Sequence, residues 1–274
     1  MRLISFSNRY LFVLGMIVAG IFILWDRKIS TDKLFLSTSD SLLVTRSGLK
    51  SNWKGEMKAS SSLAFLILAG HADSQGLAGA GTRGEAVDLN GALPMDPSMS
   101  DELYWNLIMR DAIVRVGKEM GLNIDSYDPD LRNIVDGNHP STNWSVGAKH
   151  VRRGGYALEI HFDSYGEYGI GSGLIPAVSS RLNTVDESLA RSFGRYPIFF
   201  RGGLGAPRRG IRVLELGKLE GILERDLRDP SSRQKLVDYL AIKVVQSLML
   251  GIEDKQTLNQ QHHGEYISPK VIDH

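Results

Sequence analysis

The sequence predicts an α/β fold with a mostly parallel sheet of about six strands and helices on both faces. Short apolar runs, each of the length of a buried strand, begin at Leu63, Tyr156 and Ile211. Segments with helical periodicity lie between and after these runs, which is typical of parallel strands joined by helices. Weaker apolar segments are further strand candidates: Leu34–Leu36, Leu42–Val44, Leu122–Asp125 and Leu174-Ile175.

Helix signals are clearest in two segments. Met99–Met120 repeats apolar side chains every three to four residues, and Ser100 can cap its start. The last helix has Asp229 as its cap and Pro230 at its first position, and we expect Gly251 to follow its end. Two shorter helices are expected at Asn143–Arg153 and Asp186–Phe193.

Composition limits the classes of protein that the chain can be. Its 274 residues are 42% hydrophobic, which is enough for a substantial core. The formal net charge of +1 gives no reason to expect a nucleic-acid partner. The chain has no cysteine, so disulfides and thiolate metal sites are excluded, and a metal would need histidine or carboxylate ligands.

The N-terminus predicts a membrane anchor over residues 1–28. Tyr10–Trp25 carries no charge and no strongly polar side chain, and a helix of that length spans most of a membrane core. The alternative is a signal peptide, but no small-residue cleavage site follows the run. Composition then predicts a polar linker over residues 29–59, a compact domain over 60–253 and a disordered polar tail over 254–274.

Four titratable residues have positions that could bring them together. His71, His161 and Glu215 each stand at or just beyond the end of an apolar run, and Glu85 lies in a glycine-rich loop that follows His71. In open α/β sheets, ligands bind outside the carboxyl ends of the strands. The four side chains could therefore converge on one metal ion.

The residue types fit a catalytic zinc, which usually has three protein ligands and one position left for water. We expect His71, Glu85 and His161 to be the ligands and Glu215 to be the general base that moves the proton of the water. Glu159 faces the same side of its strand as His161, so it could orient that ring or replace Glu215 as base. Taken singly, each residue also has an ordinary interpretation as a surface or packed side chain, and their joint occurrence favours the site.

The same residues resemble those of the zinc-dependent N-acetylmuramoyl-L-alanine amidases. The likeness lies in Gly70-His71, in Glu85 fourteen positions later, in Ile160-His161, and in Val213-Leu214-Glu215-Leu216-Gly217, in the right order along the chain. Asp186–Phe193 is similar to the family's helix that begins Ser-x-x-Leu-Ala. The likeness covers roughly residues 63–252.

The resemblance implies a sheet of about six strands, one zinc ion and peptidoglycan as the substrate. It implies cleavage of the amide between muramic acid and the stem peptide, with the catalytic domain on the extracytoplasmic side of the membrane. It makes His71, Glu85 and His161 the zinc ligands and Glu215 the catalytic glutamate. The sequence departs from the family at three places near the site: Ala72-Asp73, Phe162-Asp163 and Lys218.

Two other functions compete with this interpretation. The chain could be a zinc amidohydrolase or carboxypeptidase-like enzyme that acts on a different amide. It could also be a non-catalytic module that binds the cell wall. Small soluble amide substrates distinguish the first alternative, and bound zinc without turnover would indicate the second.

Overall fold

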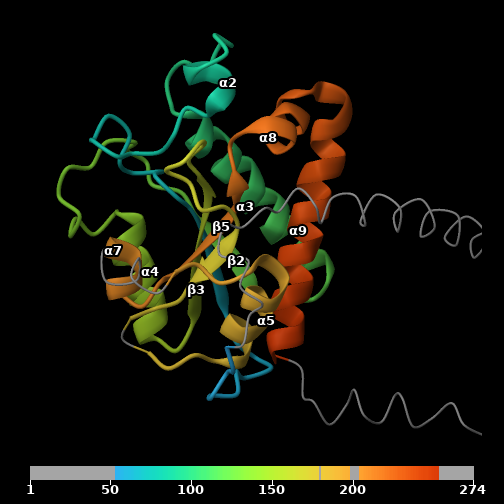
Figure 1. The fold of residues 1–274 in the computed structure, drawn as a ribbon. Helices are drawn as coiled ribbons and strands as arrows, with labels where there is room; N and C mark the ends of the chain where they lie inside the picture. The colour runs from blue at the N-terminus through green and yellow to red at the C-terminus, as the bar shows by residue number, and fades with distance from the viewer. Residues whose placement is uncertain (1–52, 179, 198–203, 253–274) are drawn as a thin grey trace, which may run out of the picture. The chain divides into compact units, whose positions relative to one another are not determined.

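The computed structural model describes residues 53–178, 180–197 and 204–252 (Figure 1). Five strands form its sheet, in the order β2-β1-β3-β5-β4. Four of them are parallel, and β4 alone runs antiparallel, against β5. The bounds of the strands are β1 Phe65–Ala69, β2 Ile124–Tyr127, β3 Tyr156–Asp163, β4 Gly173–Ile175 and β5 Arg212–Lys218.

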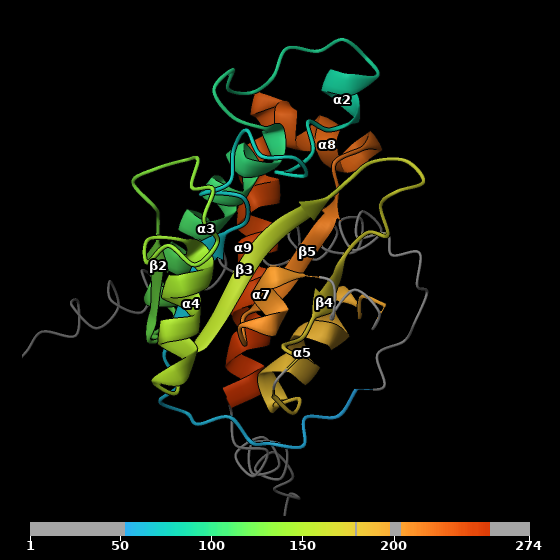
Figure 2. The ribbon, with the colours of Figure 1, turned by 90° about the vertical axis from the view of Figure 1, so that its left-hand side faces the viewer.

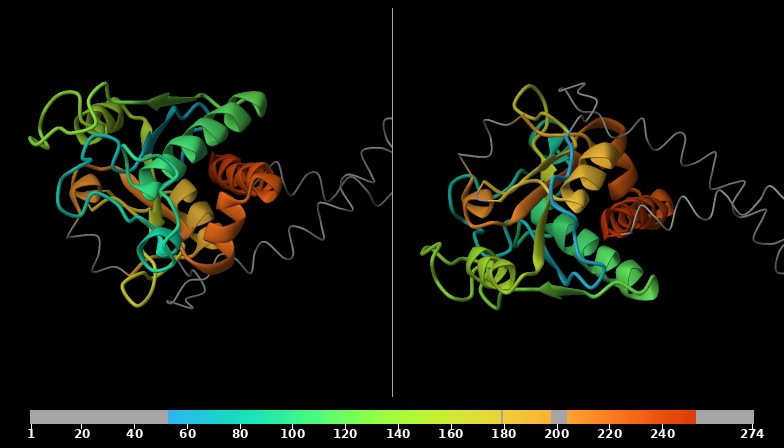
Figure 3. Two further views of the ribbon diagram at one scale, coloured as in Figure 1. Left: turned by 90° about the horizontal axis from the view of Figure 1, so that it is seen from above. Right: turned by 90° about the horizontal axis from the view of Figure 1, so that it is seen from below.

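The described part of the chain also contains seven helices, and they cover both faces of the sheet. Helices α4 and α7 lie on one face, while α3, α5, α8 and α9 lie on the other (Figures 2 and 3). The bounds of the helices are α2 Glu85–Asp88, α3 Asp101–Glu119, α4 Asn143–Arg152, α5 Thr184–Phe193, α7 Gly205–Arg208, α8 Gly221–Arg228 and α9 Pro230–Ile252. The predicted mixed α/β fold is confirmed, with five strands among the described residues.

The residues expected to cap the starts of α3 and α9 do so, whereas the end of α9 differs from the prediction. The Ser100 hydroxyl accepts a hydrogen bond from the Leu103 N–H at the start of α3, and Asp229 accepts one from Ser231 at the start of α9. Gly251 differs from the prediction, because it lies inside the last turn of α9. A Cβ on Gly251 would stand 2.5 Å from the Cα of Val185, so this glycine allows α9 to pack closely against α5.

The strands that carry the site are buried on both faces. Every residue of β1 is buried, and Ile67, Leu68 and Ala69 are fully enclosed. This burial explains the continuous apolar run, because helices cover both faces of the strand. The polar side chains that follow β1 and that lie in the second half of β3 and in the middle of β5 are therefore exceptions to an apolar interior.

Residues just before the predicted domain boundary belong to the fold. The Gly55 N–H donates to Glu187 over 2.8 Å, the Ala59 N–H donates to Thr184 over 3.0 Å, and Met57 forms a bridge with Asn183. These bonds attach the segment to the start of α5. The compact structure therefore begins before Ser60.

The expected anchor over residues 1–28, most of the linker and the tail over 254–274 lie outside the described residues. Among the helices that the structure does describe, none is long and apolar enough to cross a membrane. Leu34–Leu36 and Leu42–Val44, the two weak strand candidates, also lie outside the described part of the chain.

Candidate metal centre

Three parallel strands and one helix bring the candidate residues to the same edge of the sheet. Strand β3 lies between β1 and β5, and its His161 is directly opposite Glu215 in the register. Helix α3 returns from β1 to β2, so its first turn lies near the edge where β1 ends. The fold thus collects side chains at the carboxyl edge, where open sheets bind ligands.

His71 leaves the end of β1 in an unusual backbone conformation. Its φ of 62° is the only positive value among the non-glycine residues that the structure describes. A left-handed conformation costs a residue with a Cβ about 1 kcal/mol or more, and such residues cluster at functional sites. The preceding residue must be glycine, because a Cβ on Gly70 would stand 2.3 Å from Cε1 of the His161 ring.

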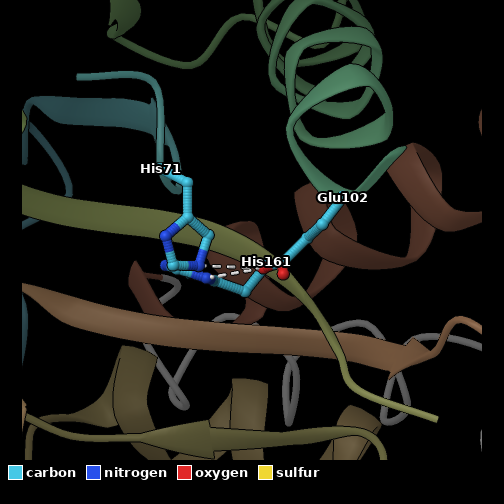
Figure 4. Close-up of side chains that lie close together, drawn as sticks. All are labelled: His71, Glu102 and His161. Carbon is cyan, nitrogen blue, oxygen red and sulfur yellow. Dashed lines mark hydrogen bonds and ion pairs between the residues drawn. The ribbon is translucent and has the colours of Figure 1, made fainter. Parts of the chain in front are cut away.

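The two histidines meet at the carboxylate of Glu102 (Figure 4). Its Oε1 lies 3.2 Å from Nε2 of His71 and 3.0 Å from Nδ1 of His161. The rings have centroids 4.8 Å apart and an interplanar angle of 85°. One ligand atom from each of the three side chains lies within 4.8 Å of the other two, so the group could hold a metal ion.

Glu102 is held in place by its own helix and by the preceding loop. It is the second residue of α3 and is buried, and its Oε2 accepts a hydrogen bond of 2.8 Å from the Thr82 N–H. Burial raises the pKa of this carboxyl group, but the charges and hydrogen bonds of His71 and His161 outweigh burial and hold the pKa far below its ordinary value. The Glu102 carboxylate is therefore ionised beside the two imidazoles.

Glu85, the expected third ligand, lies elsewhere. It is the first residue of α2, and its Oε2 accepts a hydrogen bond of 2.8 Å from the Gly221 N–H at the start of α8. The structure places Glu102, and not Glu85, beside the two histidines. The physical reason is that the segment from Ala72 to Ser100 forms a long loop with the short helix α2 inside it, and the chain returns to the sheet edge only at α3.

A signal in the sequence could have indicated Glu102. It lies in the first turn of the predicted helix Met99–Met120, two residues after the cap Ser100. The N-terminus of a helix that follows a parallel strand lies at the carboxyl edge of the sheet. Spacing from His71 favoured Glu85, whereas the topology favours Glu102.

Glu215, on β5, lies beside His161 of β3, and one of its two carboxylate oxygens has no polar partner. The side chain is buried, and its Oε2 makes no hydrogen bond. Burial raises the pKa of Glu215 well above its ordinary value; the positive His161 ring opposes this effect, and the carboxylates of Asp163, Glu102 and Glu159 add to it. A buried carboxyl group without a partner is costly for a fold, so this one indicates a functional role.

Glu159 also faces the site from β3. Its Oε2 lies 4.0 Å from Nε2 of His161, on the opposite side of the ring from Glu102. Burial lowers the pKa of the His161 ring, but the hydrogen bond that the ring donates to Glu102 and the nearby carboxylate of Glu159 outweigh burial and raise the pKa well above its ordinary value. Glu159 therefore acts on the site through the orientation and charge of His161.

These side chains line an open cleft of about 980 Å³. His71, Glu102, Glu159, His161 and Glu215 line it, together with residues of the loops that follow β1 and β3. Asp73 also lines the cleft; its Oδ2 accepts a hydrogen bond of 2.7 Å from the Asn143 N–H. A cleft of this size can admit an extended substrate to the three convergent side chains.

Comparisons with known proteins give matches among solved structures only. No protein-family model matches the sequence, and no curated protein matches it. The crystal structure of N-acetylmuramoyl-L-alanine amidase from Clostridium difficile 630 is 10% identical, with a TM-score of 0.44 over 71% of this chain and 99% of that chain.

Two further structures match over a similar share of the chain. The amidase from Nostoc punctiforme is 12% identical, with a TM-score of 0.42 over 70% of this chain and 97% of its own. That from Mycobacterium smegmatis is 14% identical, with a TM-score of 0.42 over 69% of this chain and 99% of its own. All three are N-acetylmuramoyl-L-alanine amidases.

Proposed function

We propose that this chain is a zinc-dependent amidase that cleaves the bond between N-acetylmuramic acid and L-alanine in peptidoglycan. One observation carries the proposal: two imidazoles and a carboxylate meet at the carboxyl edge of the sheet, next to a buried carboxyl group without a partner. The sequence resemblance to the zinc amidases, stated above, supplies the bond that is cleaved.

The donor set fits zinc. His71 and His161 offer nitrogen and Glu102 offers oxygen, which is a ligand combination of catalytic zinc sites that leaves a fourth position open. When bound, zinc would polarise the carbonyl of the substrate and lower the pKa of a water molecule to about 7. We propose Glu102 as the third ligand in place of Glu85.

Glu215 is the proposed general base. Its Oε2 has no other partner, so it is available to take a proton from the attacking water and to pass that proton to the leaving amine. Glu159 is better placed to hold His161 than to act on substrate, because its second oxygen, Oε1, accepts a hydrogen bond from the Asn143 side chain.

Two aspartates in the cleft favour a second candidate function, with a different amide as the substrate. Asp73 and Asp163 both line the cleft, and they stand where the family that this sequence resembles has different residues. These two carboxylates add acidic groups to the lining of the cleft, besides those of the proposed metal ligand and base. The alternative function is therefore a zinc amidohydrolase that acts on another amide.

The proposed location follows from the substrate. We propose that residues 1–28 tether the domain to a membrane and that the catalytic domain faces the extracytoplasmic side, where peptidoglycan lies. The apolar segment Tyr10–Trp25 supports the tether.

The test combines metal analysis with product analysis. The full-length chain in detergent should contain close to one zinc per molecule, and it should release stem peptides with a free L-alanine amine from purified sacculi. Mass spectrometry of the products identifies the bond. Zinc without release of peptides, together with hydrolysis of a small N-acyl amino acid, would support the alternative function.

A further inference from the structure

Two asparagine side chains hold the turn that presents His71. The Asn143 amide donates a hydrogen bond of 2.6 Å to the carbonyl of Ala69, the last residue of β1. The Asn106 amide donates one of 3.2 Å to the carbonyl of Gly70, the next residue. The two consecutive carbonyls that precede His71 are thus each bound by a side-chain amide.

The two amides reach the turn from opposite faces of the sheet. Asn106 lies on α3 and Asn143 is the first residue of α4, and these helices cover different faces (Figure 3). The turn is therefore held from both sides. This arrangement needs two elements that are distant in the sequence, and neither asparagine belongs to the metal cluster itself.

Both asparagines are fully buried, and each has an oxygen atom without a hydrogen-bond partner. A buried amide that satisfies only part of its hydrogen-bonding capacity is unfavourable for folding compared with an apolar side chain of similar shape. Two such residues that bind consecutive carbonyls of one turn require an explanation beyond the stability of the fold.

The turn that the two asparagines hold determines the positions of both histidine side chains. His71 has the positive φ described above, and Gly70 lies directly against the His161 ring. A shift of this turn would therefore move the His71 nitrogen and also change the space available to His161. Metal affinity depends strongly on groups that orient the ligands without touching the metal.

We propose that Asn106 and Asn143 are positioning residues that hold the Ala69-Gly70-His71 turn in the conformation required to bind a metal ion. The proposal rests on the metal site of the proposed function. Both asparagines act through the backbone of the turn, and Asn143 also donates a hydrogen bond of 3.4 Å to Oε1 of Glu159. Their unpaired oxygens are the consequence of placing an amide donor on each carbonyl.

The test measures metal affinity and stability separately in Asn106→Leu and Asn143→Leu. Zn²⁺ and Co²⁺ affinities of the full-length chain are measured by competition with a chromophoric chelator, and thermal melting is measured without metal. Ser247→Ala is the matched control, because Ser247 is also a buried polar residue, but it bonds Ser192 and Lys243 and does not line the cleft.

We expect each asparagine variant to bind metal about 10- to 100-fold more weakly. Metal-free melting should stay cooperative, and its temperature should fall only by the cost of a lost buried hydrogen bond, as in Ser247→Ala. Wild-type affinity in both variants would overturn the proposal, as would a loss of cooperative melting without metal, because that result would make the asparagines structural. If the wild-type chain itself binds no metal, the proposed function fails together with this inference. If the wild-type chain binds metal and the variants bind it equally well, only the inference fails.

Discussion

Replacing Glu215 with glutamine separates proton transfer from every other role of this position. Glutamine has nearly the same shape and can still accept a hydrogen bond, but it cannot take a proton at neutral pH. Because Oε2 of Glu215 makes no hydrogen bond, the substitution removes no bond that holds the fold. It also replaces a buried ionisable group with a neutral one, so the melting temperature should not fall.

The expected loss of activity is large. General acid–base catalysis contributes about 10²- to 10⁴-fold to a rate, which corresponds to roughly 3 to 5 kcal/mol of activation free energy. The turnover of sacculi by Glu215→Gln should therefore fall at least 100-fold, while zinc content stays at the wild-type level. Release of free stem peptides, quantified by mass spectrometry, is the assay.

Glu159→Gln is the matched control, because it changes a second buried glutamate that faces the same cleft. It keeps an oxygen for the Asn143 amide, so its effect should be smaller and should appear partly as weaker metal binding through His161. If Glu215→Gln retains near-normal turnover while Glu159→Gln abolishes it with zinc still bound, Glu159 and not Glu215 is the general base.

Three further predictions concern the metal, the pH dependence of stability and the domain boundary. Elemental analysis should find zinc lost in one set of variants (His71→Ala, His161→Ala and Glu102→Ala) and retained in another (Glu85→Ala and His150→Ala); zinc loss in Glu85→Ala alone would restore the original ligand assignment. Burial raises the pKa of Glu224 from an ordinary 4.5 to about 7. An unfolded glutamate releases its proton near pH 4.5 and the folded one near 7, so stability falls as pH rises through this window, by about 3 kcal/mol at most. Glu224→Gln should therefore match the wild-type melting temperature near pH 4.5 and exceed it above pH 7, and equal melting at both values would contradict the assigned pKa. A chain that begins at Trp53 should be soluble without detergent and active, whereas one that begins at Ser60 should melt lower, because it lacks the Gly55 and Ala59 bonds to α5; equal melting of the two would show that these bonds contribute nothing.

Local patterns in the sequence were sufficient for the strands and most of the helices. Buried parallel strands need continuous apolar runs, so β1, β3 and β5 could be recognised without knowledge of their neighbours. The same runs led to His71, His161 and Glu215, although β3 continues to Asp163 and β5 to Lys218, so that His161 and Glu215 lie within their strands and not at their ends. Helix ends were less certain: Gly251 remains helical because tight packing against α5 outweighs its weak helix propensity.

The third member of the cluster was decided by the tertiary structure. Glu85 and Glu102 both stand at the start of a helix, Glu85 within the loop that follows His71 and Glu102 after it; only Glu102 follows a helix cap, Ser100. The path of the chain decides which of the two reaches the histidines. The long helix α3 must return along the sheet from the end of β1, and this carries Glu102 to the sheet edge. Glu85 remains bonded to α8. The same holds for Asn106 and Asn143, whose amides reach one turn from opposite faces of the sheet and have no sequence pattern in common.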